Sequence, residues 1–198
     1  MGKRHLIISG TGRAGTTFLV QLFTLLDLDT GYSDLHSDIN PHCDAGMELD
    51  IRAPDAPYVI KSPWLCSELD GLLERGEVQI DHAIVPIRNL YAAAQSRREV
   101  SARTDAVQFP EHVPGGLWLT ENAAAQEAIL AEQFYRLMFA LTKHRVSTTL
   151  LLFPRLVLDP SYVYSALSAV LGGMTYSRFE EAFQHAAHPE LVHDYQAC

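Results

Sequence analysis

The sequence predicts an α/β fold with a mostly parallel central sheet flanked by helices, and two observations support this class. Short apolar runs typical of buried strands alternate with longer segments in which apolar residues recur at helical spacing. Parallel strands need crossover helices between them, and this alternation supplies those helices. No internal repeat and no linker rich in Gly, Ser or Pro interrupts the alternation, so we expect a single domain over residues 1–198.

The N-terminal elements follow from apolar spacing. Residues 5–9 form a short apolar run, a strand signal, which Gly10 closes. Residues 15–27 then carry apolar side chains three and four positions apart, which predicts a helix. A short strand is expected over residues 29–33.

The middle of the chain repeats the pattern. Residues 58–61 form a brief apolar run, and the Ser62-Pro63 pair after it is typical of a helix start, so a helix is expected through residue 74. Residues 80–87 are typical of a buried strand.

The last third supplies three helices and one strand. Helices are expected over residues 89–103 and 120–144, a strand over 148–153, and a helix over 159–171 that opens on an Asp-Pro pair and ends at two glycines. No element is predicted beyond that helix. Three histidines there are interpreted as part of a solvated tail rather than as metal ligands: His185, His188 and His193.

Two polar connections, residues 34–57 and 105–119, are longer than most loops in compact domains. Connections of this length are often lids, so both are candidate walls of a substrate site. Phe109 and Trp118 in the second connection are candidate pocket residues.

Composition limits the partners. The 198 residues are 47% apolar, enough for a substantial core, and carry a net charge of −9. This acidic total argues against a nucleic acid or an anionic membrane held by bulk charge, because binding to a phosphate backbone needs a basic face. Any anion must therefore be bound at a local site.

Cysteine content and the N-terminus suggest a cytoplasmic location. The three cysteines are odd in number and widely spaced, which argues against a disulfide framework or a zinc site and favours a reducing compartment: Cys43, Cys66 and Cys198. The N-terminal apolar run is too short for a signal peptide or a membrane span.

The most informative segment is the glycine-rich turn between the first strand and the first helix. Gly10 and Gly15 have the spacing of a phosphate-binding loop, in which backbone N–H groups and a helix N-terminus converge on an anion. Arg13 lies inside the loop, and no acidic residue precedes Asp27. The sequence therefore predicts an anion site here.

The loop departs from that of nucleotide hydrolases and kinases. Thr16 stands where their lysine would be, and the strands over 80–87 and 148–153 are followed by arginines rather than by an aspartate that could hold Mg²⁺. We therefore expect a transferred group that needs no metal.

The segment Gly-Thr-Gly-Arg-Ala-Gly-Thr-Thr-Phe-Leu, residues 10–19, resembles the 5′-phosphosulfate loop of the sulfotransferase family, whose donor is 3′-phosphoadenosine 5′-phosphosulfate (PAPS). Arg88 at a strand end, with Ser96 eight residues later, resembles that family's 3′-phosphate motif. Weaker similarities lie at residues 58–63 and 153–160, so the resemblance covers most of residues 5–172.

The resemblance implies a three-layer P-loop-like fold. The C-terminal Arg-Lys-Gly motif of cytosolic animal members is missing, which places the chain closer to the bacterial and carbohydrate-modifying branches.

The resemblance also implies roles for individual residues. The donor's 5′-phosphosulfate would be held by Gly12, Arg13, Ala14, Gly15, Thr16, Thr17 and Phe18, and its 3′-phosphate by Arg88 and Ser96. Three further arginines are expected near the second phosphate: Arg97, Arg98 and Arg103. Arg13 and Lys61 would offset charge near the bridging oxygen.

The general base is open between two residues. Pro63 occupies the position of the histidine that cytosolic members use, and other branches take a glutamate from the loop after the second strand. Glu48 is the first candidate because its apolar neighbours could raise its proton affinity, and His36 is the second because imidazole titrates near neutral pH.

These features predict a PAPS-dependent sulfotransferase that transfers a sulfuryl group to a hydroxyl or amine of a small-molecule or carbohydrate acceptor without a metal. Its nucleotide product would be adenosine 3′,5′-bisphosphate (PAP). Two alternatives remain open: a P-loop kinase of a small molecule that uses Mg-ATP, and a non-enzymatic nucleotide-binding module.

Overall fold

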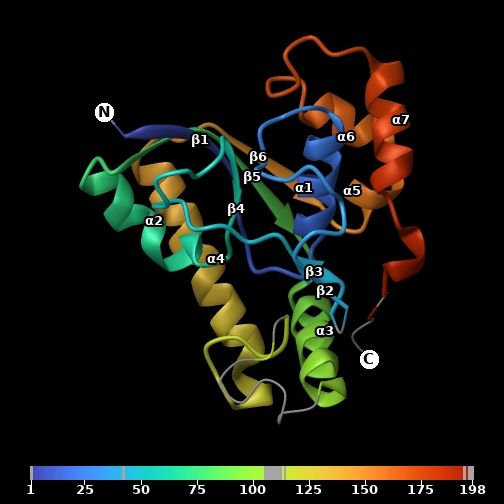
Figure 1. Cartoon of the computed structure of the whole chain (residues 1–198). Helices are drawn as coiled ribbons and strands as arrows, with labels where there is room; N and C mark the ends of the chain where they lie inside the picture. The colour runs from blue at the N-terminus through green and yellow to red at the C-terminus, as the bar shows by residue number, and fades with distance from the viewer. Residues whose placement is uncertain (1, 42, 105–112, 114, 194, 196–198) are drawn as a thin grey trace.

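A four-stranded parallel sheet forms the centre of the molecule (Figure 1). The structure is a computed structural model and describes residues 2–41, 43–104, 113, 115–193 and 195. The strand order is β4-β1-β5-β6, with β1 at Lys3–Ile8, β4 at Val59–Lys61, β5 at Val78–Ile87 and β6 at Thr148–Leu152. The predicted α/β class with a parallel sheet flanked by helices is confirmed.

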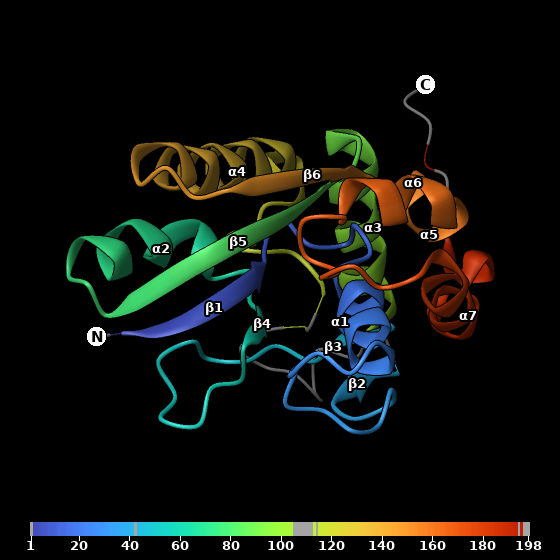
Figure 2. The same cartoon turned by 90° about the horizontal axis from the view of Figure 1, so that it is seen from above.

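Helices cover both faces of the sheet (Figure 2). One face carries α1 (Thr16–Leu25), α5 (Arg155–Leu158), α6 (Pro160–Ala166) and α7 (Tyr176–Ala186). The other carries α2 (Leu65–Glu74), α3 (Leu90–Arg103) and α4 (Gln126–Lys143). The remaining elements are short: β2 (Ile39–Asn40), β3 (Ala45–Gly46), η1 (Ala123–Ala125) and η2 (Pro189–Leu191).

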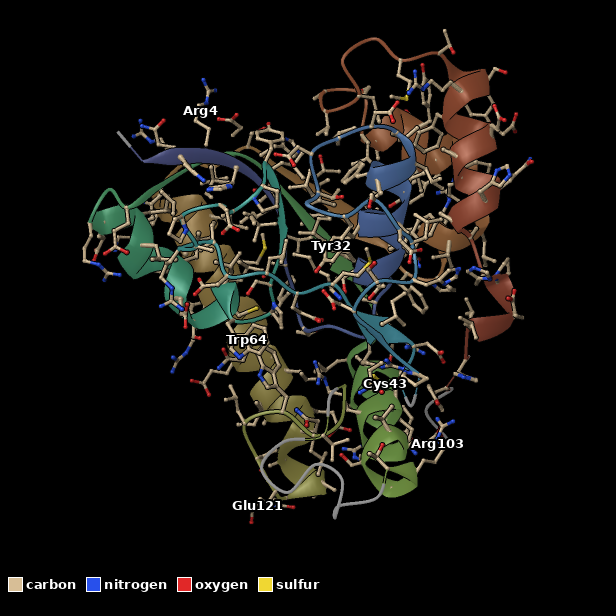
Figure 3. The ribbon with its side chains drawn as sticks, in the orientation of Figure 1. Arg4, Tyr32, Cys43, Trp64, Arg103 and Glu121 are labelled. Atoms are coloured by element: carbon tan, nitrogen blue, oxygen red, sulfur yellow. The ribbon has the colours of Figure 1, made fainter. Side chains whose placement is uncertain are left out.

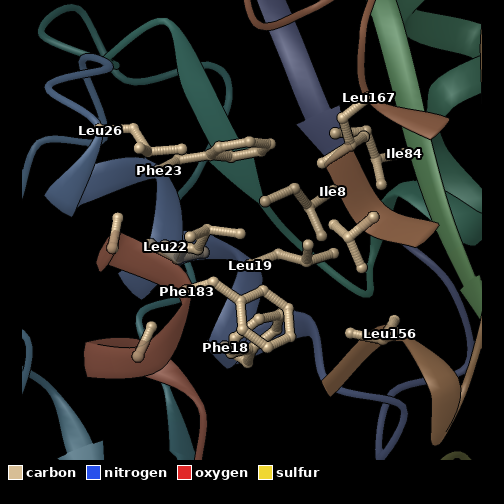
Figure 4. Packing of buried hydrophobic residues seen from close by; sticks show 14 of the residues in the cluster. Ile8, Phe18, Leu19, Leu22, Phe23, Leu26, Ile84, Leu156, Leu167 and Phe183 are labelled. Atoms are coloured by element: carbon tan, nitrogen blue, oxygen red, sulfur yellow. The ribbon is translucent and has the colours of Figure 1, made fainter. Parts of the chain in front are cut away.

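Alternation along β1 explains the two cores. Leu6 and Ile8 point to the layer of α1 and α7, while Ile7 points to the layer of α2 and α4, and all three are buried. In the first core, Phe18 of α1 meets Phe183 of α7 edge to face, with ring centroids 5.3 Å apart (Figure 4). Burial of each such aromatic side chain contributes about 1.5–3 kcal/mol, and it fixes α1 directly behind the glycine-rich loop.

Two local predictions are wrong. Residues 29–33 form no strand, because the segment makes isolated contacts with the start of β4, such as Val59 N to Asp29 O at 2.8 Å, rather than a ladder. The helix expected to open at Ser62-Pro63 begins instead at Leu65, and Trp64 before it makes no side-chain cap.

The solvated-tail interpretation of the C-terminal region is also wrong in part. The predicted helix 159–171 ends early, at Ala166, and α7 then packs its apolar face on α1. That face repeats at helical spacing and is buried: Phe179, Ala182, Phe183 and Ala186. The periodicity was present in the sequence and could have predicted this helix.

Among the residues that the structure describes, no helix is long and apolar enough to cross a membrane.

Candidate functional site

The glycine-rich loop links β1 to α1 at the carboxyl edge of the sheet. Its residues Gly12, Arg13 and Gly15 all have left-handed backbone, with φ values of 70°, 55° and 79°. A Cβ at Gly15 would lie 3.0 Å from Leu156 Cδ1, so this position combines a left-handed conformation with close packing that glycine accommodates best. A turn of this kind directs successive backbone N–H groups toward one point.

The first turn of α1 completes an anion-binding geometry. Its N-terminal position makes no side-chain cap, and its first turn contains no acidic residue. Helix N-terminal N–H groups without side-chain partners favour an anion.

Strand order brings basic residues to both sides of the loop. Because β1 lies between β4 and β5, the ends of these two neighbours flank it. Lys61 is the last residue of β4 and pairs in register with Ile8, while Arg88 directly follows β5. Side chains separated along the chain therefore meet at one edge of the sheet.

Arg97 is buried beneath the loop. Its guanidinium donates to Thr11 O at 2.6 Å and to Gly116 O at 2.8 Å, and its Nε is buried without a hydrogen-bond partner among the described residues. Burial lowers the pKa of Arg97 to about 10. The helix α3 thus inserts a desolvated cation next to the glycine-rich turn.

Arg13 is a second, partly buried cation. Its Nε donates to Ser96 Oγ at 3.1 Å, its Nη1 donates to Cys43 O at 2.5 Å, and burial lowers its pKa. Within the described part of the chain, neither Arg13 nor Arg97 makes an ion pair with a carboxylate.

Lys61 and Glu48 form an ion pair beside the loop. Lys61 Nζ lies 2.8 Å from Glu48 Oε1, and it also donates to Thr17 Oγ1 at 2.9 Å and to the carbonyl of Gly46. Only 4% of the lysine side chain is exposed, compared with 31% of the glutamate side chain. Burial lowers the pKa of Lys61, and the charge of Glu48 opposes that shift.

Two cavities adjoin the loop, and Arg13, Thr16 and Ala45 lie in the walls of both. The first has a volume of about 340 Å³ and is lined by the start of α1, by Arg88, by His36, Ile39 and residues 43–45, and by His188 and residues 191–193. The second, of about 270 Å³, contains Glu48, Lys61 and Arg97 and both tryptophans. Cys43 and Trp64, which Figure 3 labels, mark the first and second cavity respectively.

Arg88 contacts both the loop and the C-terminal segment. One of its amino groups donates to Arg13 O at 2.8 Å, and the other donates to the carbonyl of His193. Its guanidinium lies 4.7 Å from the ring centroid of Phe153 and 5.4 Å from that of Tyr195. The C-terminal segment is therefore a wall of the first cavity, which sequence reasoning missed.

The structure brings most of the predicted residues together. Residues 12–18 form the loop and the first turn of α1, with Phe18 reaching into the core. Arg88 and Ser96 do not meet each other directly in these contacts but both bind Arg13, and Ser96 is buried.

The two candidate bases lie in different cavities. Glu48 lines the second cavity next to Lys61, whereas His36 is exposed and lines the first. Glu48 contacts another predicted catalytic residue, Lys61, and no such contact of His36 is found within the described part of the chain.

Of the two candidate lids, residues 34–57 contribute to both cavities. In the second lid, Gly115 and Trp118 line the second cavity. Phe109 lies outside the described residues, as do all of 105–112 and residue 114.

Of the three additional arginines, Arg97 contacts the loop, whereas the other two pair with carboxylates. Arg98 pairs with Glu127 and donates to Ala123 O at 2.9 Å, and Arg103 lies 3.3 Å from Glu99 at the far end of α3 (Figure 3). Positions 97 and 98 are consecutive on the helix and point in different directions, so Arg97 turns toward the loop and Arg98 turns toward Glu127.

Within the described ranges, no group of three His, Cys, Asp or Glu side chains is arranged to hold a metal ion. Comparison of the chain with known protein families, with curated protein sequences and with solved structures finds no match.

Proposed function

We propose that this protein is a sulfotransferase that uses PAPS as donor and a small alcohol or amine as acceptor. The observation that carries the proposal is a pair of guanidinium groups at a glycine-rich helix start, buried Arg97 and partly buried Arg13. Among the described residues, no carboxylate lies within ion-pair distance of either group. A buried unpaired cation costs several kcal/mol, and an anionic ligand in the loop would offset that cost.

The chemistry of the walls fits the donor. The loop N–H groups and Arg13 suit a phosphosulfate, and the larger first cavity extends from the loop to Arg88, which suits a nucleotide with a second phosphate. The guanidinium of buried Arg97 adds positive charge behind the loop. These features support a doubly anionic nucleotide rather than a neutral ligand.

Glu48 and Lys61 supply the groups that acceptor activation needs. When bound, the donor supplies the sulfuryl group and its phosphate is the leaving group. Glu48, in the second cavity, would take the proton of an acceptor hydroxyl, since its carboxylate is partly exposed there. Arg13 lines both cavities and Lys61 lines the second, and both would stabilise negative charge on the transferring group.

Calorimetry with two nucleotides tests the proposal. PAP is expected to bind without any metal, whereas ATP with Mg²⁺ is expected to bind much more weakly, because the carboxylate of Glu48 is already paired with Lys61 and is not free to hold the metal. A preference for Mg-ATP would contradict the proposal and favour a kinase. Binding of PAP without any turnover of PAPS would favour a non-enzymatic nucleotide-binding module.

Arg88→Ala is expected to weaken PAP binding by about tenfold, since a half-buried charge-assisted contact contributes roughly 1.4 kcal/mol. Binding of adenosine 5′-monophosphate, which lacks the 3′-phosphate, should change little. Calorimetry of both nucleotides measures the difference. Arg136→Ala is the matched control, because this exposed arginine on α4 pairs with Glu132 and lines neither cavity. Equal losses for the two nucleotides would remove Arg88 from the 3′-phosphate site.

A further inference from the structure

Both tryptophans of the chain line the second cavity. Trp118 is a buried wall with 5% of its surface exposed, and Trp64 stands at the rim with 48% exposed (Figure 3). The two come from separate parts of the chain, one just before α2 and one before α4. Two flat aromatic side chains therefore line the cavity that contains Glu48.

Trp118 is held in place before any ligand binds. Its backbone N–H donates to Gln126 Oε1 at 2.7 Å, and Gln126 Nε2 donates back to Trp118 O at 3.3 Å. The guanidinium of Arg97 lies 5.2 Å from the Trp118 ring centroid on one side. A preorganised aromatic wall binds a flat ring without paying much conformational entropy.

Most polar groups in this cavity are already engaged. Lys61 Nζ contacts Thr17, Gly46 and Glu48, and Ser9 Oγ donates to Ser62 O at 2.8 Å. The two terminal amino groups of Arg97 donate to carbonyls. A sugar would bury several hydroxyls here with few partners, and unmatched polar groups lower affinity. The carboxylate of Glu48 can accept a hydrogen bond from one hydroxyl.

The size of the cavity also favours a small ligand with few hydroxyls. Its volume of about 270 Å³ lies just under the roughly 300 Å³ at which drug-sized ligand sites begin, so one small ring fills it. We infer that the second cavity takes a phenol: a single flat ring against the tryptophans, with its one hydroxyl at Glu48. The inference deepens the proposed function and rests on it for the reaction.

Sulfuryl transfer to a phenol needs a proton acceptor, a nucleophile and a leaving group, which Glu48, the phenol and the donor nucleotide supply. Glu48 accepts the phenolic proton, the phenolic oxygen forms a bond to sulfur, and the bond from sulfur to the nucleotide phosphate breaks. The phenolic hydroxyl has a pKa of about 10 in model compounds, so a carboxylate takes its proton more readily than that of a sugar alcohol. The expected products are an aryl sulfate and PAP.

Intrinsic fluorescence tests the inference without relying on turnover, because the only two tryptophans lie at the cavity. The full chain, with and without saturating PAP, is titrated with 4-methylphenol and with methyl β-glucoside under excitation selective for tryptophan. A saturable change with 4-methylphenol and none with the glucoside at equal concentration is expected. The reverse order, or no saturation with either probe, would overturn the inference.

Variants assign the signal to the cavity. Trp64→Ala removes an exposed ring and is expected to weaken 4-methylphenol binding up to about tenfold, while Trp64→Phe retains most of it. Tyr135→Ala, at an aromatic residue on α4 with 68% exposure, is the matched control and should change nothing. Equal loss in Trp64→Phe and Trp64→Ala, or loss in the control, would contradict ring packing.

A separate measurement of PAP binding distinguishes failure of the phenol inference from failure of the sulfotransferase proposal. If PAP binds without metal but 4-methylphenol does not, the phenol inference falls and the sulfotransferase proposal stands. If 4-methylphenol saturates but PAP fails to bind, the cavity keeps its ligand class and the proposed reaction falls.

Discussion

Glu48→Gln is expected to lower turnover by about a hundredfold or more while leaving PAP affinity unchanged. In the wild-type chain, Lys61 Nζ lies 2.8 Å from the Glu48 carboxylate. The amide of the variant keeps the size of the side chain and can still accept a hydrogen bond from Lys61. It cannot take a proton from the acceptor. Initial rates with saturating PAPS and 4-methylphenol, together with calorimetry of PAP, separate chemistry from donor binding.

Two further variants make this result specific. Asp50→Asn alters a carboxylate on the same segment that pairs with Arg52 at 2.9 Å and lines neither cavity, so it should retain activity. His36→Ala should also retain most activity, because His36 lines the first cavity rather than the second. If Glu48→Gln remains active and His36→Ala is inactive, the roles of the two residues are reversed.

Arg97→Met is expected to weaken PAP binding by about a hundredfold, or roughly 2.7 kcal/mol, with little change in the stability of the free protein. The loss of affinity follows from removal of a cation in a low-dielectric setting behind the loop. Stability changes little because two opposing effects nearly cancel. Relief of a several-kcal/mol desolvation cost offsets two hydrogen bonds to carbonyls worth about 1.5–3 kcal/mol each.

Thermal unfolding with and without PAP measures both parts of this prediction. The wild-type chain should gain a large increase in melting temperature from PAP, and Arg97→Met should gain much less. Arg98→Met is the matched control, since the neighbouring guanidinium pairs with Glu127 on another side of α3. If Arg97→Met melts at a much lower temperature without ligand but binds PAP with normal affinity, Arg97 only holds the loop to Gly116.

Local patterns predicted much of the fold correctly. The alternation of strands and helices was readable because burial on one face imposes a period of two on strands and 3.6 on helices. Helix starts at Asn89 and Asp159 were also readable, and both side chains accept a backbone N–H in the first turn, from Ala92 and Tyr162. The strand expected over residues 29–33 failed because a strand exists only where a partner offers a ladder.

The sequence by itself determined the glycine-rich loop, the class of fold and the presence of arginines near a strand end, since these depend on neighbours within a few positions. Only the tertiary structure decided which cations surround the loop and which side chains share a cavity. Arg97 meets Thr11 across 86 positions of sequence, and Lys61 meets Thr17 across 44. Such contacts depend on β1 lying between β4 and β5, and strand order is set by packing of the whole chain rather than by local spacing.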